Sequence, residues 1–236
     1  MVVGASGLVG SALLKQLVHD PLVKKITVLS RSELEVLGLG NLNTISKLRV
    51  IVAPLDDLES ALQNVSVDVV FCTLGTTMKA AKTQEAFRKV DYEYPLALAE
   101  WAKSKGAAHY LVVTALGASS SSMFFYSRVK GELQEKLAKL EQPIVHVFQP
   151  SLLLGERKTA RRGESIGAWF SKSLQFMMVG PLRKYRAIKG EDVARAMKRA
   201  AGEAMLISSK HVTITETAIQ YYTSEKIAKL ALHTTG

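Results

Sequence analysis

Tyr126 and Lys130 form a pair of side chains suited to proton transfer. They occur in the segment Tyr126-Ser-Arg-Val-Lys130, and a spacing of four residues puts both on one face of a helix. A free tyrosine has a pKa of about 10 and is a poor acid or base at neutral pH. A nearby ammonium stabilises the phenolate, which makes the tyrosine usable for proton transfer to or from an alcohol. The pair therefore predicts acid–base chemistry at a carbonyl or alcohol.

A third group is needed to hold the substrate oxygen, and Thr114 is the best-placed hydroxyl. It ends the apolar strand predicted over residues 110–114 and lies twelve residues before Tyr126. The serines at 119–122 are nearer in sequence, but the pattern puts them on a loop. The alternative is that Thr114 is only a β-branched residue at the end of a strand.

Three glycines near the amino terminus have the spacing of a phosphate-binding turn. Gly4-Ala-Ser-Gly7-Leu-Val-Gly10 follows the apolar residues 1–3 and opens a segment with helical spacing. The first glycine allows the tight turn, the second lets a pyrophosphate approach the backbone, and the third allows close helix–strand packing. The helix then presents free N–H groups to the pyrophosphate. This context predicts a bound dinucleotide. The lead-in strand is short, so either residues precede it or it is truncated.

The residues after the second predicted strand favour NADP(H). NAD-specific sites place Asp or Glu there to accept hydrogen bonds from the ribose 2′-OH. This chain has Ser30-Arg31-Ser32 instead. Arginine pairs with a 2′-phosphate and stacks on adenine, and serine hydroxyls donate to the same phosphate. We therefore predict NADP(H) as the preferred cofactor, while NAD(H) and a merely solvated arginine stay as alternatives.

Other residues follow strands at positions that would contact the cofactor. Asp56, after the third predicted strand, is placed to reach the adenine amine. Leu74, Gly75 and Thr76, after the fourth, would lie against the ribose and diphosphate. Lys130 would also bond to the nicotinamide ribose.

Apolar runs and helical periods alternate along the chain up to Pro150. Unbroken apolar strands are buried on both faces, and strands that alternate with helices need crossovers. The sequence thus predicts an α/β fold of the Rossmann type, a doubly wound parallel sheet with helices on both sides. The predicted strands are 1–3, 26–29, 48–52, 67–72, 110–114 and 144–148. The predicted helices are 9–18, 83–89, 91–106 with Asp91 as N-cap, 124–140 and 191–201.

Beyond Pro150 the pattern loosens, and we predict a small C-terminal cap. Residues 1–236 would form a single domain, with 155–189 and 203–236 contributing a cap on the substrate side. Short strands are expected near Leu206 and Val212. An apolar stretch, 169–178, is interpreted as a pocket wall or dimer contact rather than a membrane-surface helix, so a homodimer stays open.

The net charge of +10, from 31 basic and 21 acidic residues, suits a ligand with several phosphates. The densest basic cluster is Arg157, Lys158, Arg161 and Arg162, and it could bind an anionic substrate head group. Because it has no interleaved aromatic residues, the pattern argues against nucleic acid.

The number and placement of cysteine and histidine residues indicate which cellular compartment and which metal sites to expect. Cys72 is the single cysteine and sits in an apolar strand, which indicates a reducing compartment and a buried, inert thiol. No apolar run reaches the roughly 18 residues that span a bilayer, and no segment reads as a signal peptide. We therefore expect a cytoplasmic protein. The five histidines are scattered, which predicts no metal site.

Four longer segments carry a resemblance to a known family. They are Phe71-Cys-Thr-Leu-Gly-Thr-Thr77, Val90-Asp91-Tyr92, Phe124-Phe-Tyr-Ser-Arg-Val-Lys-Gly-Glu132 and Gln149-Pro-Ser-Leu-Leu-Leu-Gly-Glu-Arg157. Between Gly4 and about Arg199 the chain resembles the atypical or extended short-chain dehydrogenase/reductase superfamily. Within it, the chain is most similar to the branch of Tat-interacting protein 2 and of bacterial proteins labelled nucleoside-diphosphate-sugar epimerases.

The resemblance implies contacts and roles for particular residues. It makes Tyr126 and Lys130 the catalytic pair. The chain departs from the family pattern at two positions: Thr114, where serine is usual, and Gln149, where arginine is usual. It implies that Pro150, Ser151 and Leu153 line the nicotinamide end. Its other cofactor contacts are Gly4, Ser6, Gly7, Leu8, Val9, Arg31, Leu74, Gly75 and Lys130.

Together these observations predict an NADP(H)-dependent oxidoreductase that acts on a carbonyl or alcohol through Thr114, Tyr126 and Lys130. One alternative is a sugar-nucleotide epimerase or dehydratase that uses the same three residues with a retained cofactor. A second is a non-catalytic protein that binds NADP(H) and thereby changes how it engages a partner, since fold alone does not determine function.

Overall fold

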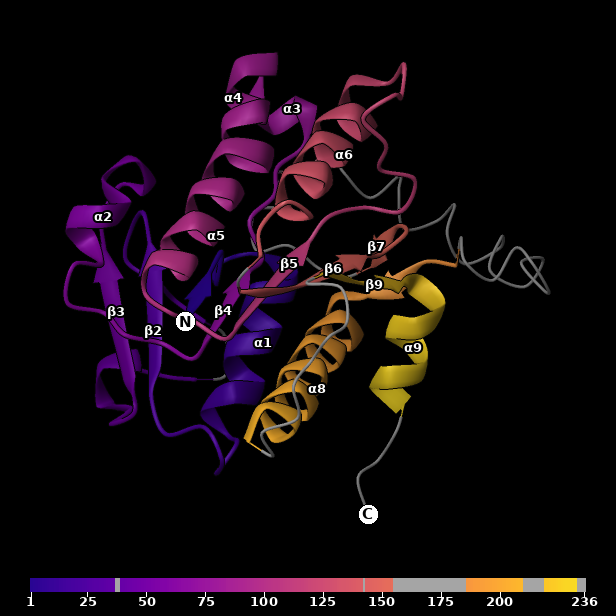
Figure 1. Cartoon of the computed structure of the whole chain (residues 1–236). Helices are drawn as coiled ribbons and strands as arrows, with labels where there is room; N and C mark the ends of the chain where they lie inside the picture. Colours follow the sequence, from indigo (N-terminus) through magenta and orange to yellow (C-terminus); the bar gives the residue numbers. More distant parts are fainter. Residues whose placement is uncertain (37–38, 142, 155–185, 210–218, 233–236) are drawn as a thin grey trace.

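The computed structural model describes residues 1–36, 39–141, 143–154, 186–209 and 219–232 (Figure 1). Within them, seven parallel strands form one sheet in the order β3-β2-β1-β4-β5-β6-β9. This order is that of a Rossmann-type doubly wound sheet, so the predicted fold class is confirmed. The strands are β1 (Val2–Val3), β2 (Ile26–Ser30), β3 (Leu48–Val52), β4 (Val69–Cys72), β5 (His109–Val113), β6 (Ile144–Gln149) and β9 (Ile219–Thr223).

Apolar side chains cover both faces of the sheet, as the unbroken apolar strands predict. One core lies under α1 (Leu8–Val18), α8 (Gly190–Ser209) and α9 (Ser224–Leu232), and the other under α2 (Leu58–Ala61), α5 (Tyr94–Ser104) and α6 (Phe125–Leu137). Successive strand residues alternate between them, with Leu111 in the first core and Val112 in the second. In Figure 1 these two groups of helices lie on opposite sides of the sheet.

The helices around Asp91 differ from the prediction. After α3 (Met78–Ala81), α4 (Gln84–Arg88) begins at its cap Thr83 and continues through a π-helical turn, Lys89–Glu93, directly into α5. Asp91 lies inside this turn, so its assignment as an N-cap was wrong. Pro95 follows the turn; because it has no N–H to donate, it fits where the regular α-helical ladder is interrupted.

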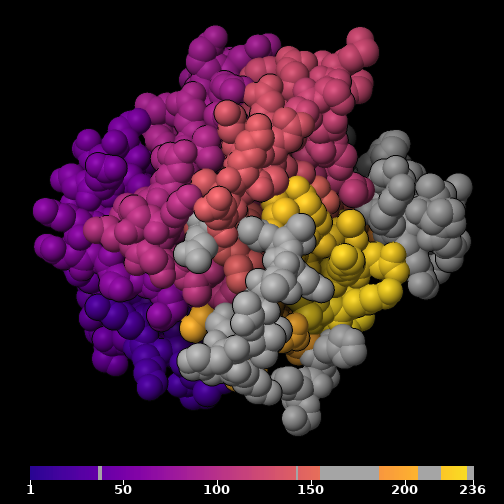
Figure 2. All heavy atoms as spheres, in the orientation of Figure 1, coloured from indigo at the N-terminus to yellow at the C-terminus, as the bar shows by residue number. Residues whose placement is uncertain are grey.

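The C-terminal part also departs from the prediction. Leu206 belongs to α8 and not to a strand, because the helical pattern that begins at Gly190 continues to Ser209. Val212 lies outside the described residues. Strand β9, which was not predicted, pairs with β6 in the main sheet and places Tyr222 opposite Phe148. Residues 219–232, yellow in the space-filling view, lie against the body of the molecule (Figure 2).

A second, two-stranded sheet lies near the carboxyl end of β6. It consists of β7 (Leu153–Leu154) and β8 (Ile188–Lys189), which pair in parallel. The end of β8 leads directly into α8 at Gly190. A Cβ at Gly190 would lie 2.6 Å from the Leu8 side chain, so α8 begins in close contact with the start of α1. This contact sets the amino ends of two helices beside each other at the carboxyl edge of the sheet. Residues 155–185 of the predicted cap lie outside the described residues.

Candidate functional site

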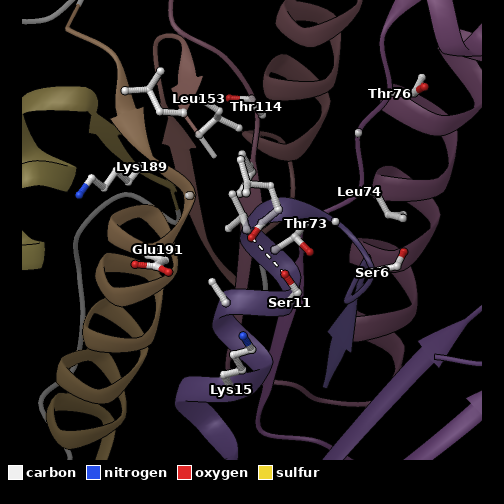
Figure 3. Close-up of a pocket in the computed structure, with 18 of the residues that line it drawn as sticks. Ser6, Ser11, Lys15, Thr73, Leu74, Thr76, Thr114, Leu153, Lys189 and Glu191 are labelled. Carbon is white, nitrogen blue, oxygen red and sulfur yellow. Dashed lines mark hydrogen bonds between the residues drawn. The ribbon is translucent and has the colours of Figure 1, made fainter. Parts of the chain in front are cut away.

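A cleft of about 990 Å³ lies at the carboxyl edge of the sheet. Ligands of doubly wound folds bind at this edge, where loops from several strands converge. Figure 3 shows Ser6 and Ser11 near the start of α1, Leu74 and Thr76 after β4, and Leu153, Lys189 and Glu191 across the cleft. The cleft brings together more than half of the residues predicted from sequence: Ser6, Gly7, Leu8, Val9, Leu74, Gly75, Thr76, Thr114, Tyr126, Lys130 and Leu153.

The glycine turn has the geometry that its sequence predicts. Gly4 has a φ of +90°, and its backbone packs so closely that a Cβ would lie 2.7 Å from the Thr73 carbonyl carbon. A Cβ at Gly10 would lie 2.2 Å from the Gly4 oxygen, so a side chain at either position would displace the turn.

The start of α1 is prepared for an anion. Its N-cap residue Gly7 has no side chain to cap the helix, and its first turn carries no acidic residue. Ser11 Oγ donates to the Leu8 oxygen (3.4 Å; dashed in Figure 3) and therefore does not occupy these N–H groups. Unpaired N–H groups and the positive end of the helix dipole fit a diphosphate.

Lys130 forms a buried ion pair that sequence reasoning missed. Its Nζ lies 2.6 Å from Asp91 Oδ1, and the two side chains are 4% and 1% exposed. The other oxygen, Asp91 Oδ2, accepts a hydrogen bond from the Thr76 N–H at 2.8 Å. The π-helical turn thus carries a carboxylate to the floor of the cleft, which Asp91 also lines. The Val90-Asp91-Tyr92 motif in the family resemblance was the one signal that pointed to this residue.

Tyr126 lies in the first turn of α6, at the mouth of the cleft. Its side chain is 41% exposed, and its ring contacts Phe87 of α4 at a centroid distance of 5.5 Å. The loop before α6 crosses the helix at Gly131, where a Cβ would lie 2.1 Å from the Ser119 carbonyl carbon. The crossing leaves room only for glycine at that position. Gly131 directly follows Lys130 in α6, so this close crossing holds the loop near the site.

The Thr114 hydroxyl is buried and already hydrogen-bonded. Its Oγ1 accepts from Gln134 Nε2 at 2.8 Å and donates to the Phe148 oxygen at 3.4 Å. Gln134 Oε1 in turn accepts from Gln149 Nε2 at 3.0 Å. The two departures from the family pattern, Thr114 and Gln149, are therefore linked through one glutamine. Thr114 still lines the cleft.

The residues predicted at the adenine end lie outside the cleft. Ser30 ends β2, and Arg31 and Ser32, which follow it, are exposed. Glu35 and Val36, a few residues further on, do line the cleft, so it extends to the segment after β2.

The Asp56 carboxylate is engaged elsewhere. It pairs with Lys89 Nζ at 2.7 Å and accepts from the Tyr94 phenol at 3.1 Å, in a separate cavity of about 600 Å³. The hydrogen bond from Lys89 lowers the pKa of Asp56. An adenine amine would have to compete with both partners.

Two of the three residues predicted at the nicotinamide end have structural roles. The buried Pro150 accepts from the Leu116 N–H at 2.9 Å. The Ser151 N–H donates to Ser224 Oγ at 2.7 Å and its hydroxyl donates to the Arg186 oxygen. Only Leu153 of this group lines the cleft. Ser151 therefore ties β7 to the start of α9 and to the residues before β8.

Other chemistry is limited among the described residues. They contain no group of three or more His, Cys, Asp or Glu side chains that could hold a metal ion. Cys72 is buried, and burial raises the pKa of its thiol, as expected for an inert residue. Of the helices that the structure describes, none has the length and hydropathy to cross a membrane.

Known proteins resemble this chain in sequence and in fold. A family model described as NAD(P)H-binding matches residues 4–143, more than half of the chain. Protein HTATIP2 of Rattus norvegicus is 36% identical over 173 residues, which are 73% of this chain and 70% of that protein. Protein FMP52-1, mitochondrial, of Scheffersomyces stipitis is 30% identical over 233 residues, 97% of this chain and 96% of that protein. The crystal structure of UDP-glucuronic acid 4-epimerase from Bacillus cereus in complex with NAD aligns with a TM-score of 0.62 and 13% identity, over 95% of this chain and 76% of that one.

The fold and the glycine turn define an NAD(P)-binding Rossmann protein of the short-chain dehydrogenase/reductase type. The chain belongs to the NAD(P)H-binding family, in the atypical branch that includes HTATIP2 and the FMP52 proteins. The resemblance read from the sequence is therefore confirmed. The epimerase likeness, at 13% identity, establishes the shared fold.

Proposed function

We propose that this chain is an NADP(H)-dependent oxidoreductase acting on a carbonyl or alcohol. The observation that carries the proposal is that Tyr126, Lys130 and Thr114 line the same cleft as the glycine turn. A proton donor beside a dinucleotide site is the arrangement that a carbonyl reduction needs.

Each of the three residues has a separate task. Bound NADP(H) supplies the hydride for reduction of the carbonyl carbon, or accepts it in the reverse direction. Tyr126 gives its phenolic proton to the carbonyl oxygen and takes it back when an alcohol is oxidised. The Thr114 hydroxyl, turned from the Phe148 oxygen toward the substrate, donates a hydrogen bond to the same oxygen and orients it. Lys130 stabilises the phenolate and bonds to the cofactor ribose.

The preference for NADP(H) rests on charge. The residues directly after β2 include no carboxylate until Glu33, and Arg31 is exposed there. A guanidinium matches a 2′-phosphate, whereas the ribose 2′-OH of NAD(H) is normally held by an acidic residue. The net charge of +10 also suits a ligand with three phosphate groups.

A titration with NADPH and NADH, monitored by nucleotide fluorescence, tests the proposal. We expect NADPH to bind at least about tenfold more tightly, the equivalent of about 1.4 kcal/mol. Arg31→Ala should remove most of this difference while leaving NADH unchanged. Tyr126→Phe should retain NADPH binding and abolish turnover of a carbonyl substrate found by screening. Absence of binding by either nucleotide, together with no nucleotide released on denaturation, would rule the proposal out.

One observation favours a second candidate, a protein that senses NADP(H) without turnover. Thr114 Oγ1 accepts from Gln134 and donates its proton to the Phe148 oxygen, so the hydroxyl that should hold a substrate oxygen already has partners on both sides. In such a protein Tyr126→Phe would be harmless, whereas Arg31→Ala would abolish partner binding. The two variants together separate an enzyme from a sensor.

A further inference from the structure

Asp91 has one carboxylate oxygen that is buried, charged and incompletely satisfied. Oδ2 accepts from the Thr76 N–H, but Oδ1 has no hydrogen-bond partner among the described residues, although Lys130 Nζ lies 2.6 Å away. The ion pair is short, but its geometry is not that of a hydrogen bond. A buried carboxylate oxygen has room for two acceptor contacts, and leaving it unpaired is costly. A ligand hydroxyl would complete it.

The pair borders the cleft beneath residue 75, which has no side chain. A Cβ at Gly75 would lie 3.6 Å from Asp91 Oδ1 and 3.9 Å from Lys130 Nζ. Any larger residue there would therefore cover both charged groups. All three residues line the cleft, as does Gly7 of the glycine turn. The carboxylate and ammonium thus present an acceptor and a donor, side by side, to one ligand.

An adjacent acceptor and donor match a vicinal diol. One hydroxyl donates to the carboxylate while its oxygen or its neighbour accepts from the ammonium, and hydrogen bonds to charged groups are the stronger ones. A lysine alone offers only donors, so the carboxylate adds the acceptor that a hydroxyl proton needs. The dinucleotide proposed for this cleft carries such a diol on its nicotinamide ribose.

We propose that Asp91 is a cofactor-binding residue, which accepts a hydrogen bond from a nicotinamide ribose hydroxyl at Oδ1 and forms with Lys130, over Gly75, a diol subsite. This inference rests on the proposed function, because it takes a dinucleotide as the ligand of the cleft. It adds a residue and a contact chemistry that the glycine turn and Lys130 do not provide.

Two ligands that share the adenine end and differ at the nicotinamide end test the subsite. NADPH carries the nicotinamide ribose, whereas adenosine 2′,5′-bisphosphate lacks it. For Asp91→Asn, kept at a temperature where circular dichroism shows it folded, we expect the Kd for NADPH to rise about tenfold or more. The Kd for adenosine 2′,5′-bisphosphate should change less than about twofold. Glu93→Gln is the matched control, because Glu93 is an exposed carboxylate of the same π-helical turn and does not line the cleft.

Gly75→Ala gives a second test that leaves both charged groups in place. Its methyl group meets them at ordinary contact distances, so the fold should tolerate it, but it fills the space above the pair. We expect it to weaken NADPH by a similar factor and to spare adenosine 2′,5′-bisphosphate. Combining it with Asp91→Asn should weaken NADPH binding little further, because both changes act on the same contact.

The outcomes separate this inference from the proposed function. If the unaltered protein binds no dinucleotide, the proposed function fails and the subsite fails with it. If the unaltered protein binds NADPH and Asp91→Asn binds it equally well, only the subsite is overturned. Equal weakening of NADPH and adenosine 2′,5′-bisphosphate by Asp91→Asn would also overturn it, since the effect would then be a general loss of structure.

Discussion

Two buried polar clusters lie at different levels of the same sheet; one contains an ion pair and the other contains two histidines. Beneath the cleft, Asp91 and Lys130 form an ion pair at 2.6 Å with almost no exposure. Further down strands β5 and β6, His109 Nδ1 and His146 Nε2 lie 3.2 Å apart, and both histidines are 1% exposed. Neither histidine lines the cleft. Burial is equal at the two places, so the state of charge depends on the partners.

The histidine cluster is satisfied by neutral groups. Tyr222 donates to Gln220 Oε1 at 2.8 Å, so His146 Nδ1 donates to the phenol oxygen at 3.1 Å and His146 Nε2 accepts from His109. Each imidazole then needs only one proton. Burial, and next the neighbouring His109, lower the pKa of His146 to about 4. Burial also lowers the pKa of His109. At the cleft, by contrast, the buried carboxylate of Asp91 has the Lys130 ammonium as its partner.

The largest effect should come from breaking the ion pair. Asp91→Ala leaves the buried Lys130 ammonium unpaired, and we expect the free energy of unfolding to fall by about 3–5 kcal/mol. Urea denaturation followed by circular dichroism measures this change. Removing both charges, with Asp91→Ala and Lys130→Met, should restore much of the loss.

Glu93→Ala is the control for this prediction. It removes an exposed carboxylate from the same turn, so the free energy of unfolding should change by no more than about 0.5 kcal/mol. If the double variant were no more stable than Asp91→Ala, the lost stability would come from packing and the charge argument would be wrong.

The sheet and the glycine turn were predictable because each depends on local sequence. The strand predicted at 48–52 has the bounds of β3, and the unbroken apolar strands indicate burial on both faces. Strand β9 was not predicted, since Ile219-Gln-Tyr-Tyr-Thr223 mixes polar and apolar residues, and none of the five is fully buried. Its place beside β6 depends on the crossover through α8, which local pattern does not reveal.

The contacts of the site were harder to predict than its members. Asp91 before a proline-containing helix has the local pattern of an N-cap, and the ion pair depends on α6, which comes much later in the chain. The link from Thr114 through Gln134 to Gln149 joins β5, α6 and β6. Asp56 follows the predicted strand as expected, but Lys89 and Tyr94 of the π-helical turn and α5 engage its carboxylate. Such contacts follow from tertiary packing.

The second-largest effect should come from acid, which lowers the free energy of unfolding through the histidine cluster. In the unfolded chain His146 takes up a proton near its ordinary pKa of 6.5, whereas in the folded protein it stays neutral until about pH 4. The unfolded state therefore binds more protons between these values, and stability falls as the pH falls. The cluster is fully stabilising above pH 6.5, and its contribution decreases by about 3 kcal/mol as the pH reaches 4.

Urea denaturation at several pH values, with His146→Gln as the comparison, measures this contribution. Carboxylates also titrate in this range, so the difference between the two proteins is the relevant quantity. The variant should be less stable at pH 7 and should lose less stability on going to pH 4.5. Parallel pH dependence of the two proteins would show that folding does not lower the pKa of His146.

The smallest effect should come from Tyr222→Phe, which separates the two clusters functionally. The phenylalanine keeps the stacking on Phe148, where the ring centroids are 4.5 Å apart, but leaves His146 Nδ1–H without its acceptor. We expect the free energy of unfolding to fall by about 1 kcal/mol, the usual value of a hydrogen bond. Affinity for NADPH should stay the same, because Tyr222 does not line the cleft. A weakened NADPH affinity would instead mean that β9 transmits strain to the cleft through β6, and that the two clusters act as one.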